Sequence, residues 1–243
     1  MYYHNPPRRG PDVRRVRGRA TRSRLLSAAT REFGLRGYDA TSTRTIASVA
    51  RANQASIRYH FGGKDELYLA VANSVAEKHG NVLLPMIMRS RRAFPNRATA
   101  RNDLAEIMAA FTRQLLDVSD AGAGGMFVAR ELMTPGVGFP ILYHGYIREL
   151  HEHVTTLLAR ATARLPRAFD AIIDAHSLIG AALGFASMRR VLRQRSYRPT
   201  FTKERVELVA GRIAALTGYM SEQRAMSPTA IAPPRVGTAY TPA

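Results

Sequence analysis

Residues 54–68 read QASIRYHFGGKDELY, and this stretch decides the fold. Ile57 and Phe61 lie four residues apart, which places both on one face of a short helix. Gly62-Gly63 ends that helix, and a new helical pattern begins at Lys64. The other side chains of the short helix are mostly Gln, Ser, Arg, Tyr and His, an unusual set for a surface that meets only water. Its polar face is therefore expected to contact a partner.

Two helices are predicted upstream of this stretch. The first spans residues 19–36, and Gly34 and Gly37 indicate its end. Its apolar residues recur on one face at the helical period: Leu25, Leu26, Ala29 and Phe33. The second is short and begins after a cap at Thr41 or Ser42. Its apolar positions are Ile46, Val49 and Ala50.

A tight turn separates the two short helices. Residues 51–53 interrupt the pattern, and Asn53 can cap the helix of residues 54–60. Two short helices joined by a tight turn and packed on a longer one form a helix-turn-helix arrangement. The last helix of such a unit enters a DNA major groove about 12 Å wide, so it needs a polar outer face and an apolar inner face. Residues 54–60 meet both demands.

The composition favours a polyanionic partner. The 243-residue chain has a formal net charge of +18, and only three of its 36 basic residues are lysine. This charge predicts affinity for nucleic acid first and for an anionic membrane surface second. The absence of cysteine excludes disulfides, thiolate metal sites and thiol nucleophiles. No uncharged apolar run of 18 residues and no secretory signal is visible, so we expect a cytoplasmic protein without a membrane span.

The rest of the chain is predicted to be all-α, with about nine helices in total. We expect a disordered basic arm over residues 1–18, the helix-turn-helix domain over 19–65, a helical ligand-binding and dimerisation domain over 66–223, and a disordered tail over 224–243. Helical patterns in the second domain begin at Lys64 and then cover about residues 100–118, 126–133, 139–164, 168–194 and 203–222. Pro85 either kinks or ends the first of these helices, and residues 89–99 are predicted to be a loop or a frayed helix end.

Residues 40–72, ATSTRTIASVARANQASIRYHFGGKDELYLAVA, resemble the DNA-binding domain of TetR/AcrR-type transcriptional regulators. Residues 25–41, LLSAATREFGLRGYDAT, resemble the first helix and turn of the same domain. The resemblance implies a recognition helix over 54–60. It also implies a set of DNA-contacting residues: Thr43, Arg44, Gln54, Ala55, Ser56, Arg58, Tyr59, His60 and Lys64.

The sequence departs from this pattern at two positions. Arg51 stands where the family's turn usually holds glycine, so a positive φ there would cost about 1 kcal/mol. Thr45 stands where an acidic residue often completes a capping box with Ser42. Less specific readings also stay open: Tyr59 could pack between helices, and His60 could be an ordinary boundary histidine. Outward arginines such as Arg58 often make no specific contact.

Residues 130–149, RELMTPGVGFPILYHGYIRE, resemble the C-terminal domain of the CecR-like branch of the family, which implies a ligand pocket. An apolar wall with a few polar tips suits a small molecule. The candidate ligand-binding residues are Met108, Phe111, Met133, Phe139, Tyr143 and His144. The alternative is a plain core helix. His151 and His153 lack the i, i+4 spacing of a two-histidine metal site, so no metal and no cofactor is expected.

A dimer interface is predicted from small residues in SLIGAALGFASM, residues 177–188. Gly180, Ala181 and Gly184 would let two helices approach closely, and Ile213 and Leu216 of the last helix would complete a two-fold four-helix interface. Packing within one chain is the alternative.

These features predict a ligand-responsive homodimer that binds a palindromic DNA operator in a sequence-specific manner, and the family resemblance implies that it acts most often as a repressor. The basic arm is expected to follow the adjacent minor groove. The alternative is a basic adaptor that binds nucleic acid or an anionic membrane without sequence specificity. An enzyme is not expected, because the sequence shows no nucleophile with a base, no metal motif and no phosphate-cradling glycine loop.

Overall fold

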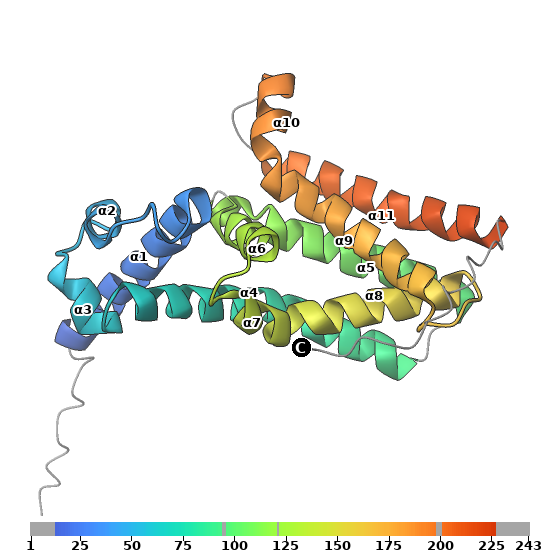
Figure 1. The fold of residues 1–243 in the computed structure, drawn as a ribbon, viewed down its shortest axis with the longest axis horizontal. Helices are drawn as coiled ribbons and strands as arrows, with labels where there is room; N and C mark the ends of the chain where they lie inside the picture. The colour runs from blue at the N-terminus through green and yellow to red at the C-terminus, as the bar shows by residue number, and fades with distance from the viewer. Residues whose placement is uncertain (1–12, 94–95, 121, 198–200, 227–243) are drawn as a thin grey trace, which may run out of the picture.

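The computed structural model describes residues 13–93, 96–120, 122–197 and 201–226, and their regular structure is helical throughout. Figure 1 shows an elongated arrangement in which α4 connects the helix-turn-helix unit to the larger helical unit. The helices are α1 (Val13–Arg36), α2 (Thr43–Val49), α3 (Ala55–Phe61), α4 (Lys64–Ala93), α5 (Arg97–Leu115), α6 (Ala123–Met133), α7 (Phe139–Leu142), α8 (Arg148–Ala161), α9 (Phe169–Ser187), α10 (Arg189–Ser196) and α11 (Lys203–Met226). The predicted all-α class is confirmed.

Several helices extend beyond their predicted ends. Helix α1 begins at Val13, so residues 13–18 are helical and do not belong to a disordered arm. Arginine is a good helix former, and six of the first twelve residues of α1 are arginines, which accounts for the extension. The other predicted disordered residues, 1–12 and 227–243, lie outside the described residues, and 224–226 belong to α11.

Helix α4 does not end at Pro85 but continues to Ala93. The proline removes one backbone hydrogen bond. Leu83 and Ile87, on either side of it, are fully buried, so tertiary packing holds the helix together there. Residues 89–93 are therefore helical, although the sequence pattern predicted a loop or a frayed end.

The helix-turn-helix unit is built on one small core. Leu25 and Phe33 of α1, Ile46 of α2, Ile57 of α3 and Leu67 of α4 are all nearly or fully buried. Ser42 accepts a hydrogen bond from the backbone N–H of Thr45 at 3.0 Å and so caps α2 as predicted. The amphipathic pattern accounts for most of this unit. Val49, predicted on the apolar face of α2, is instead 44% exposed, and Phe61 is only partly buried.

The larger unit packs around α5, which contacts α4, α8, α9 and α11. Helix α6 lies against α1 and thus joins the two units. Two glycines allow close helix crossings here. A side chain at Gly34 would come 2.7 Å from the carbonyl oxygen of Ala123, and one at Gly125 would come 1.8 Å from the carbonyl oxygen of Leu115. Gly34 therefore lies inside α1 and lets α6 pack closely against it. Gly37, with φ +83°, follows the last residue of α1 and ends the helix.

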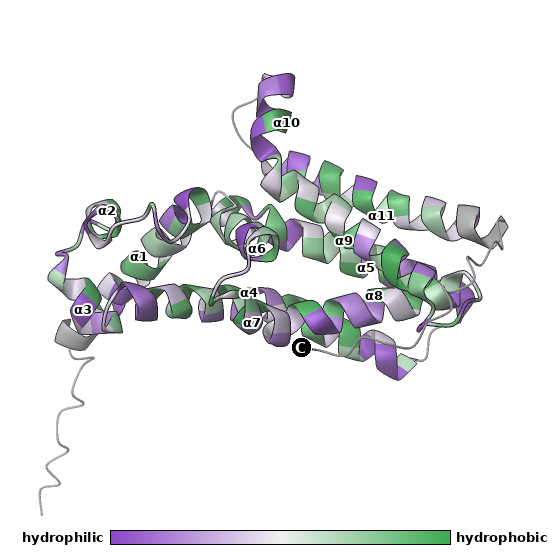
Figure 2. Cartoon of the chain, viewed as in Figure 1, coloured by the Kyte–Doolittle hydropathy of each residue, from purple (hydrophilic) through white to green (hydrophobic). Residues whose placement is uncertain are grey.

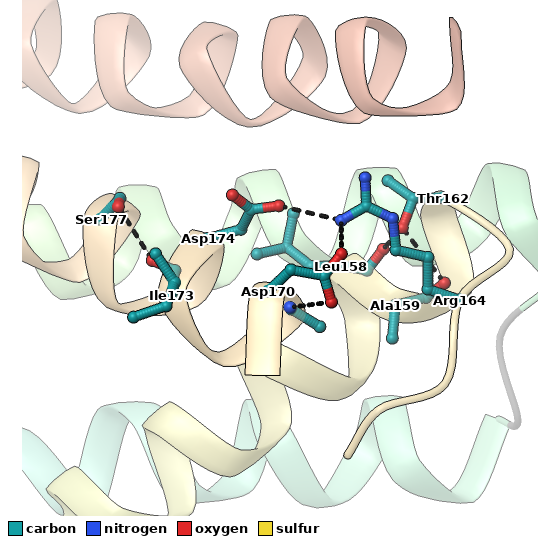
Figure 3. Close-up of polar contacts among 9 residues, drawn as sticks. Leu158, Ala159, Thr162, Arg164, Asp170, Ile173, Asp174 and Ser177 are labelled. Carbon is teal, nitrogen blue, oxygen red and sulfur yellow. Dashed lines mark hydrogen bonds and ion pairs between the residues drawn. The ribbon is translucent and has the colours of Figure 1, made fainter. Parts of the chain in front are cut away.

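The segment between α8 and α9 is tied to α9 by charge (Figure 3). The half-buried Arg164 bonds Asp170 at 2.8 Å and Asp174 at 3.2 Å, which fixes the direction in which α9 leaves the turn. By length and composition, α9 is the one helix of the described chain apolar enough to cross a membrane, but the same test selects core helices of ordinary domains. One face of α9 is indeed buried, including Leu178 and Ala182.

Candidate nucleic-acid interface

Helix α3 presents the predicted polar face. Gln54, Ala55, Arg58 and Tyr59 are exposed, Ser56 is half-buried, and the side chain of Tyr59 is 83% exposed. The Asn53 side chain accepts a hydrogen bond from the Ala55 N–H at 2.9 Å, so the predicted cap is present. Ile57 is buried beneath this face. The helix is thus docked by its apolar side, and its polar side is exposed to solvent.

The first residues of α2 lie beside α3. Gln54 Nε2 donates to Thr43 Oγ1 at 3.0 Å, and Arg44 is exposed next to Thr43. This hydrogen bond positions the side chain at the start of the recognition helix in the absence of DNA. Four predicted contact residues, Thr43, Arg44, Gln54 and Arg58, therefore come from the two helices of one unit.

The turn between α2 and α3 contains the predicted irregularity. Arg51 has φ +50°, in the left-handed region that favours glycine. Its side chain is exposed, and the neighbouring Ala52 N–H donates to the Ala47 carbonyl at 2.9 Å, so the turn keeps its ordinary closure. The turn is not remodelled around the arginine, and the strain stays at Arg51.

Replacing Arg51 with glycine is expected to raise the free energy of unfolding by up to about 1 kcal/mol, because glycine adopts a positive φ without steric cost. Arg51→Ala removes the same charge but keeps the Cβ, so it is expected to give no such gain. Urea unfolding followed by circular dichroism measures both variants. Equal stability of the glycine and alanine variants would contradict the strain argument.

Tyr59 and His60 stand at the end of α3 as neighbouring rings with centroids 4.9 Å apart. His60 is half-buried near Gly18 of α1, and Arg22 of α1 lies 4.9 Å above the ring of Phe61. The N-terminal part of α1, which is rich in arginine, is thereby held next to the recognition helix. The exposure of Tyr59 argues against the reading in which it packs between helices.

Gly62 and Gly63 place Lys64 at the first turn of α4. Gly62 has φ +101°, so the chain can reverse between α3 and α4. Lys64 Nζ lies 4.1 Å from the ring centroid of Tyr38, and the Tyr38 hydroxyl donates to the carboxylate of Asp65. This hydrogen bond, together with burial, raises the pKa of Tyr38 to about 12. Lys64 is therefore positioned by an aromatic ring that is itself anchored to α4.

The cations of this surface have no acidic partners in the part of the chain that is described. Arg44, Arg58 and Lys64 form no ion pair among these residues. Their positive charge is thus available to phosphate groups. When these side chains bind phosphate, no salt bridge within the protein has to break.

The candidate ligand-binding residues do not share one cavity. Met108 and Phe111 are fully buried in the hydrophobic core between α5 and its neighbours. Met133 is 73% exposed at the end of α6. Phe139 and Tyr143 stack with centroids 5.6 Å apart, and His144 adjoins Tyr143 on the surface. The residues therefore divide between core and surface, which periodicity alone could not distinguish.

The candidate dimer residues are divided in a similar way. A side chain at Gly180 or Gly184 of α9 would meet nothing within 4 Å, so this face is open, and Ala181 is half-buried beside it. Ile213 is only 3% exposed and packs in the core of its own chain, and Leu216 packs against that core. The exposed residues of α11 include Leu208, Gly211 and Tyr219, together with charged residues such as Glu207 and Arg212.

Two polar groups that link the units were missed by the sequence reasoning. Arg130 of α6 donates to the carbonyl oxygens of Gly34 and Leu35 at the end of α1, at 3.5 and 3.2 Å. The buried Glu131 accepts from the hydroxyl of Tyr68 in α4 and from the Gly136 N–H at 3.1 Å. The Tyr68 ring contacts Phe33 and Tyr38, so α6 reaches the site of Lys64 through one aromatic cluster.

A third missed feature is a π-helical turn, Tyr143–Ile147, between α7 and α8. It places Tyr146 in the core, where its hydroxyl lies 3.1 Å from Nδ1 of the buried His79. Burial lowers the pKa of His79 to about 4, and its Nε2 has no hydrogen-bond partner. No local sequence signal marks this pair, because its members are 67 residues apart.

A helix-turn-helix with an open polar recognition helix, free cations around it and a separate helical unit defines a DNA-binding transcriptional regulator. Comparison with known proteins agrees. Residues 25–71 match the family described as bacterial regulatory proteins, tetR family, and residues 100–222 match the C-terminal domain of the HTH-type transcriptional dual regulator CecR. The chain belongs to the TetR family and carries a CecR-type C-terminal domain.

One relative and two solved structures are similar to the chain along most of its length. The HTH-type transcriptional dual regulator CecR of Shigella flexneri is 31% identical over 197 residues, which cover 80% of this chain and 88% of the relative. A TetR-like regulator from Rhodococcus sp. RHA1 has a TM-score of 0.56 at 19% identity, covering 86% and 97% of the two chains. AibR in complex with isovaleryl coenzyme A and operator DNA has a TM-score of 0.56 at 18% identity, covering 81% and 97%. The two structures show the same fold.

Proposed function

We propose that this protein is a homodimeric repressor that reads a palindromic operator with α3 and leaves it when a small-molecule effector binds. The exposed polar face of α3, docked through the buried Ile57, carries the proposal. A structural neighbour, AibR in complex with isovaleryl coenzyme A and operator DNA, supports the part of the proposal in which this fold binds both a small molecule and DNA. Such an operator places the protein in the bacterial cytoplasm, and the proposed role is binding rather than catalysis.

Base reading is assigned to Gln54, Ala55, Ser56 and Arg58, and backbone contacts to Thr43, Arg44, Tyr59, His60 and Lys64. Arginine forms bidentate hydrogen bonds with guanine and glutamine with adenine in the major groove. The N-terminal arginines of α1 extend this surface beyond His60, and they are proposed to reach the adjacent minor groove.

Selecting bound sequences from a random DNA pool tests this assignment. Arg58→Ala is expected to weaken binding of the selected site by about 1–3 kcal/mol and to relax the motif at one position of each half-site. Gln54→Ala is expected to relax another position. Arg44→Ala is the matched control: it removes the same charge from a phosphate contact, so affinity should fall for all sequences while the motif stays.

An unchanged motif in both Arg58→Ala and Gln54→Ala would contradict the recognition-helix assignment. Failure of the wild-type protein to enrich any motif, with binding that depends on salt alone, would favour the alternative of a nonspecific basic adaptor.

The dimer is proposed to form through the outer faces of α9 and α11, which contact each other within the chain. Figure 2 shows hydrophobic residues along both helices. The exposed apolar side chains there include Ile173, Leu208 and Tyr219, and the open glycines are Gly180, Gly184 and Gly211. Small residues permit close approach of helices, and burial of the surrounding apolar side chains would stabilise the dimer. Two such faces related by a two-fold axis form a four-helix interface.

Gly180→Leu combined with Gly184→Leu is expected to give a folded monomer. Each new side chain has open space within the chain but would hold two α9 helices apart. Light scattering at micromolar concentration measures the mass, and circular dichroism checks the fold. Asn102→Leu adds an exposed leucine to α5 and should leave the dimer intact. A monomeric wild-type protein, or a dimeric glycine variant, would contradict the proposed interface.

A further inference from the structure

A hollow of about 530 Å³ opens where α1, α6, α9 and α10 meet, at the end of α1 opposite the recognition helix. Five of its lining residues are arginines, and they come from three helices. They are Arg31 of α1, Arg130 of α6, and Arg189, Arg190 and Arg193 of α10. In Figure 1, α10 projects from the body of the protein above this junction.

The hollow has an uncompensated positive charge. Its one acidic residue is Asp120, and this carboxylate already pairs with Lys78 at 3.0 Å and accepts from the Ala123 N–H at 2.9 Å. Within the described ranges, none of the five arginines forms a salt bridge. Such a concentration of guanidinium groups attracts an anion with more than one negative charge.

Arg189 lies against the backbone at the start of α6. Gly122, with φ +73°, lies so close that a side chain there would come 2.8 Å from Nη1 of Arg189. The Nε of Arg189 is buried without a hydrogen-bond partner. Burial, followed by repulsion from Arg193, lowers the pKa of Arg189. A bound anion would relieve this repulsion.

Apolar side chains also line the hollow, together with the hydroxyl residues Thr134 and Ser187. Leu35, Met126, Ala129, Met133 and Ala186 line it beside the arginines. A cavity of this size accommodates a small organic molecule, and the mixture of cations and apolar surface suits a charged head on an apolar body. We propose that this hollow is an effector site for a small phosphate ester, with its phosphate oxygens bound by Arg130, Arg189 and Arg193. Several guanidinium groups that line one hollow favour a phosphate over a single carboxylate, because a phosphate presents three oxygens and up to two charges.

The position of Arg130 connects this site with DNA binding, and this step rests on the proposed function. Arg130 supplies hydrogen bonds to the last carbonyl groups of α1. A phosphate that binds Arg130 competes with those carbonyl groups and loosens α1 from α6. The N-terminal part of α1 adjoins α3, so the change reaches the recognition helix and weakens operator binding.

Isothermal titration with inorganic pyrophosphate, at constant ionic strength, tests the site. The double variant Arg189→Ala, Arg193→Ala is expected to weaken pyrophosphate binding at least tenfold. Arg92→Ala combined with Arg167→Ala is the matched control, because it removes two exposed arginines outside the hollow and changes the net charge equally. It should leave binding unchanged.

Equal weakening in both double variants would overturn the site, because binding would then follow net charge alone. Unchanged binding in the α10 variant would overturn it too. Citrate that binds as tightly as pyrophosphate at the same ionic strength would overturn the phosphate class. If the α10 variant binds the selected DNA more weakly than the control does without pyrophosphate, the arginines contact DNA and the proposal is wrong.

The regulatory step is measured with the DNA motif selected above, by fluorescence anisotropy. Saturating pyrophosphate is expected to weaken DNA binding of the wild type about 5-fold or more and to leave the α10 double variant unaffected. An unchanged wild-type affinity would overturn the coupling. A protein that binds pyrophosphate in the hollow but selects no DNA motif would count against the proposed function instead, so the two failures are distinguishable.

Discussion

Replacing Gly125 with alanine is expected to destabilise the protein by at least about 3 kcal/mol. The new Cβ would lie 1.8 Å from the carbonyl oxygen of Leu115, and backbone cannot move aside as a flexible side chain can. Helix α6 would have to shift away from α5, which also disturbs its contact with α1. Urea unfolding followed by circular dichroism measures the loss.

Gly124 provides a matched control on the same helix. Its Cβ would meet Asp120 Oδ2 at 3.4 Å and His79 Nε2 at 3.8 Å, which are ordinary contact distances. Gly124→Ala is therefore expected to be neutral or to stabilise the protein by up to about 1 kcal/mol through helix propensity. Equal stability of the two variants would contradict the close approach of α6 to the end of α5 at Gly125.

Replacing Glu131 with alanine is expected to cost about 3 kcal/mol and to weaken operator binding. The buried carboxylate accepts from the Tyr68 hydroxyl and from the Gly136 N–H, and both donors would lose their acceptor. Tyr68 contacts Phe33 and Tyr38, and Tyr38 positions Lys64. Loss of one acceptor in α6 thus reaches a proposed phosphate contact. Urea unfolding measures stability, and fluorescence anisotropy measures DNA affinity.

Tyr68→Phe is the matched control for Glu131→Ala, because it removes the Tyr68 hydroxyl but leaves the Glu131 carboxylate in place. It removes one donor but keeps the ring contacts, so it is expected to cost about 1 kcal/mol and to preserve DNA affinity. If Tyr68→Phe weakens DNA binding as much as Glu131→Ala does, the aromatic contacts alone do not carry the connection. If Glu131→Ala leaves stability unchanged, the buried carboxylate is not bonded as described.

The helix-turn-helix unit was predictable because its signals are local. The cap at Asn53, the buried Ile57 and the positive φ of Arg51 each depend on residues within a few positions in sequence. Gly34 shows the limit of this reasoning. The pattern indicated a helix end there, but the residue lies within α1 and allows α6 to approach.

The contacts between the units could not be predicted from the sequence. Arg130 bonds carbonyl groups 95 and 96 residues away, and Glu131 bonds Tyr68 over 63 residues. Hydrophobic periodicity reports which face of a helix is buried, but not what that face meets. For the same reason Met108 and Phe111 fitted a ligand wall and a plain core equally well, and only the packing of α5 places them in the core.

Helix α4 has a mechanical consequence. It runs unbroken for 30 residues, so it is about 45 Å long and acts as a lever arm between the two units. Lys64 is at one tip, and the contact of His79 with Tyr146 lies near the middle. A tilt of about 5° around the far end would displace the tip of such a lever by ~4 Å, which is more than one base-pair step along DNA. Small changes in helix packing that leave the core intact can therefore move the recognition helix α3 out of register with the DNA major groove.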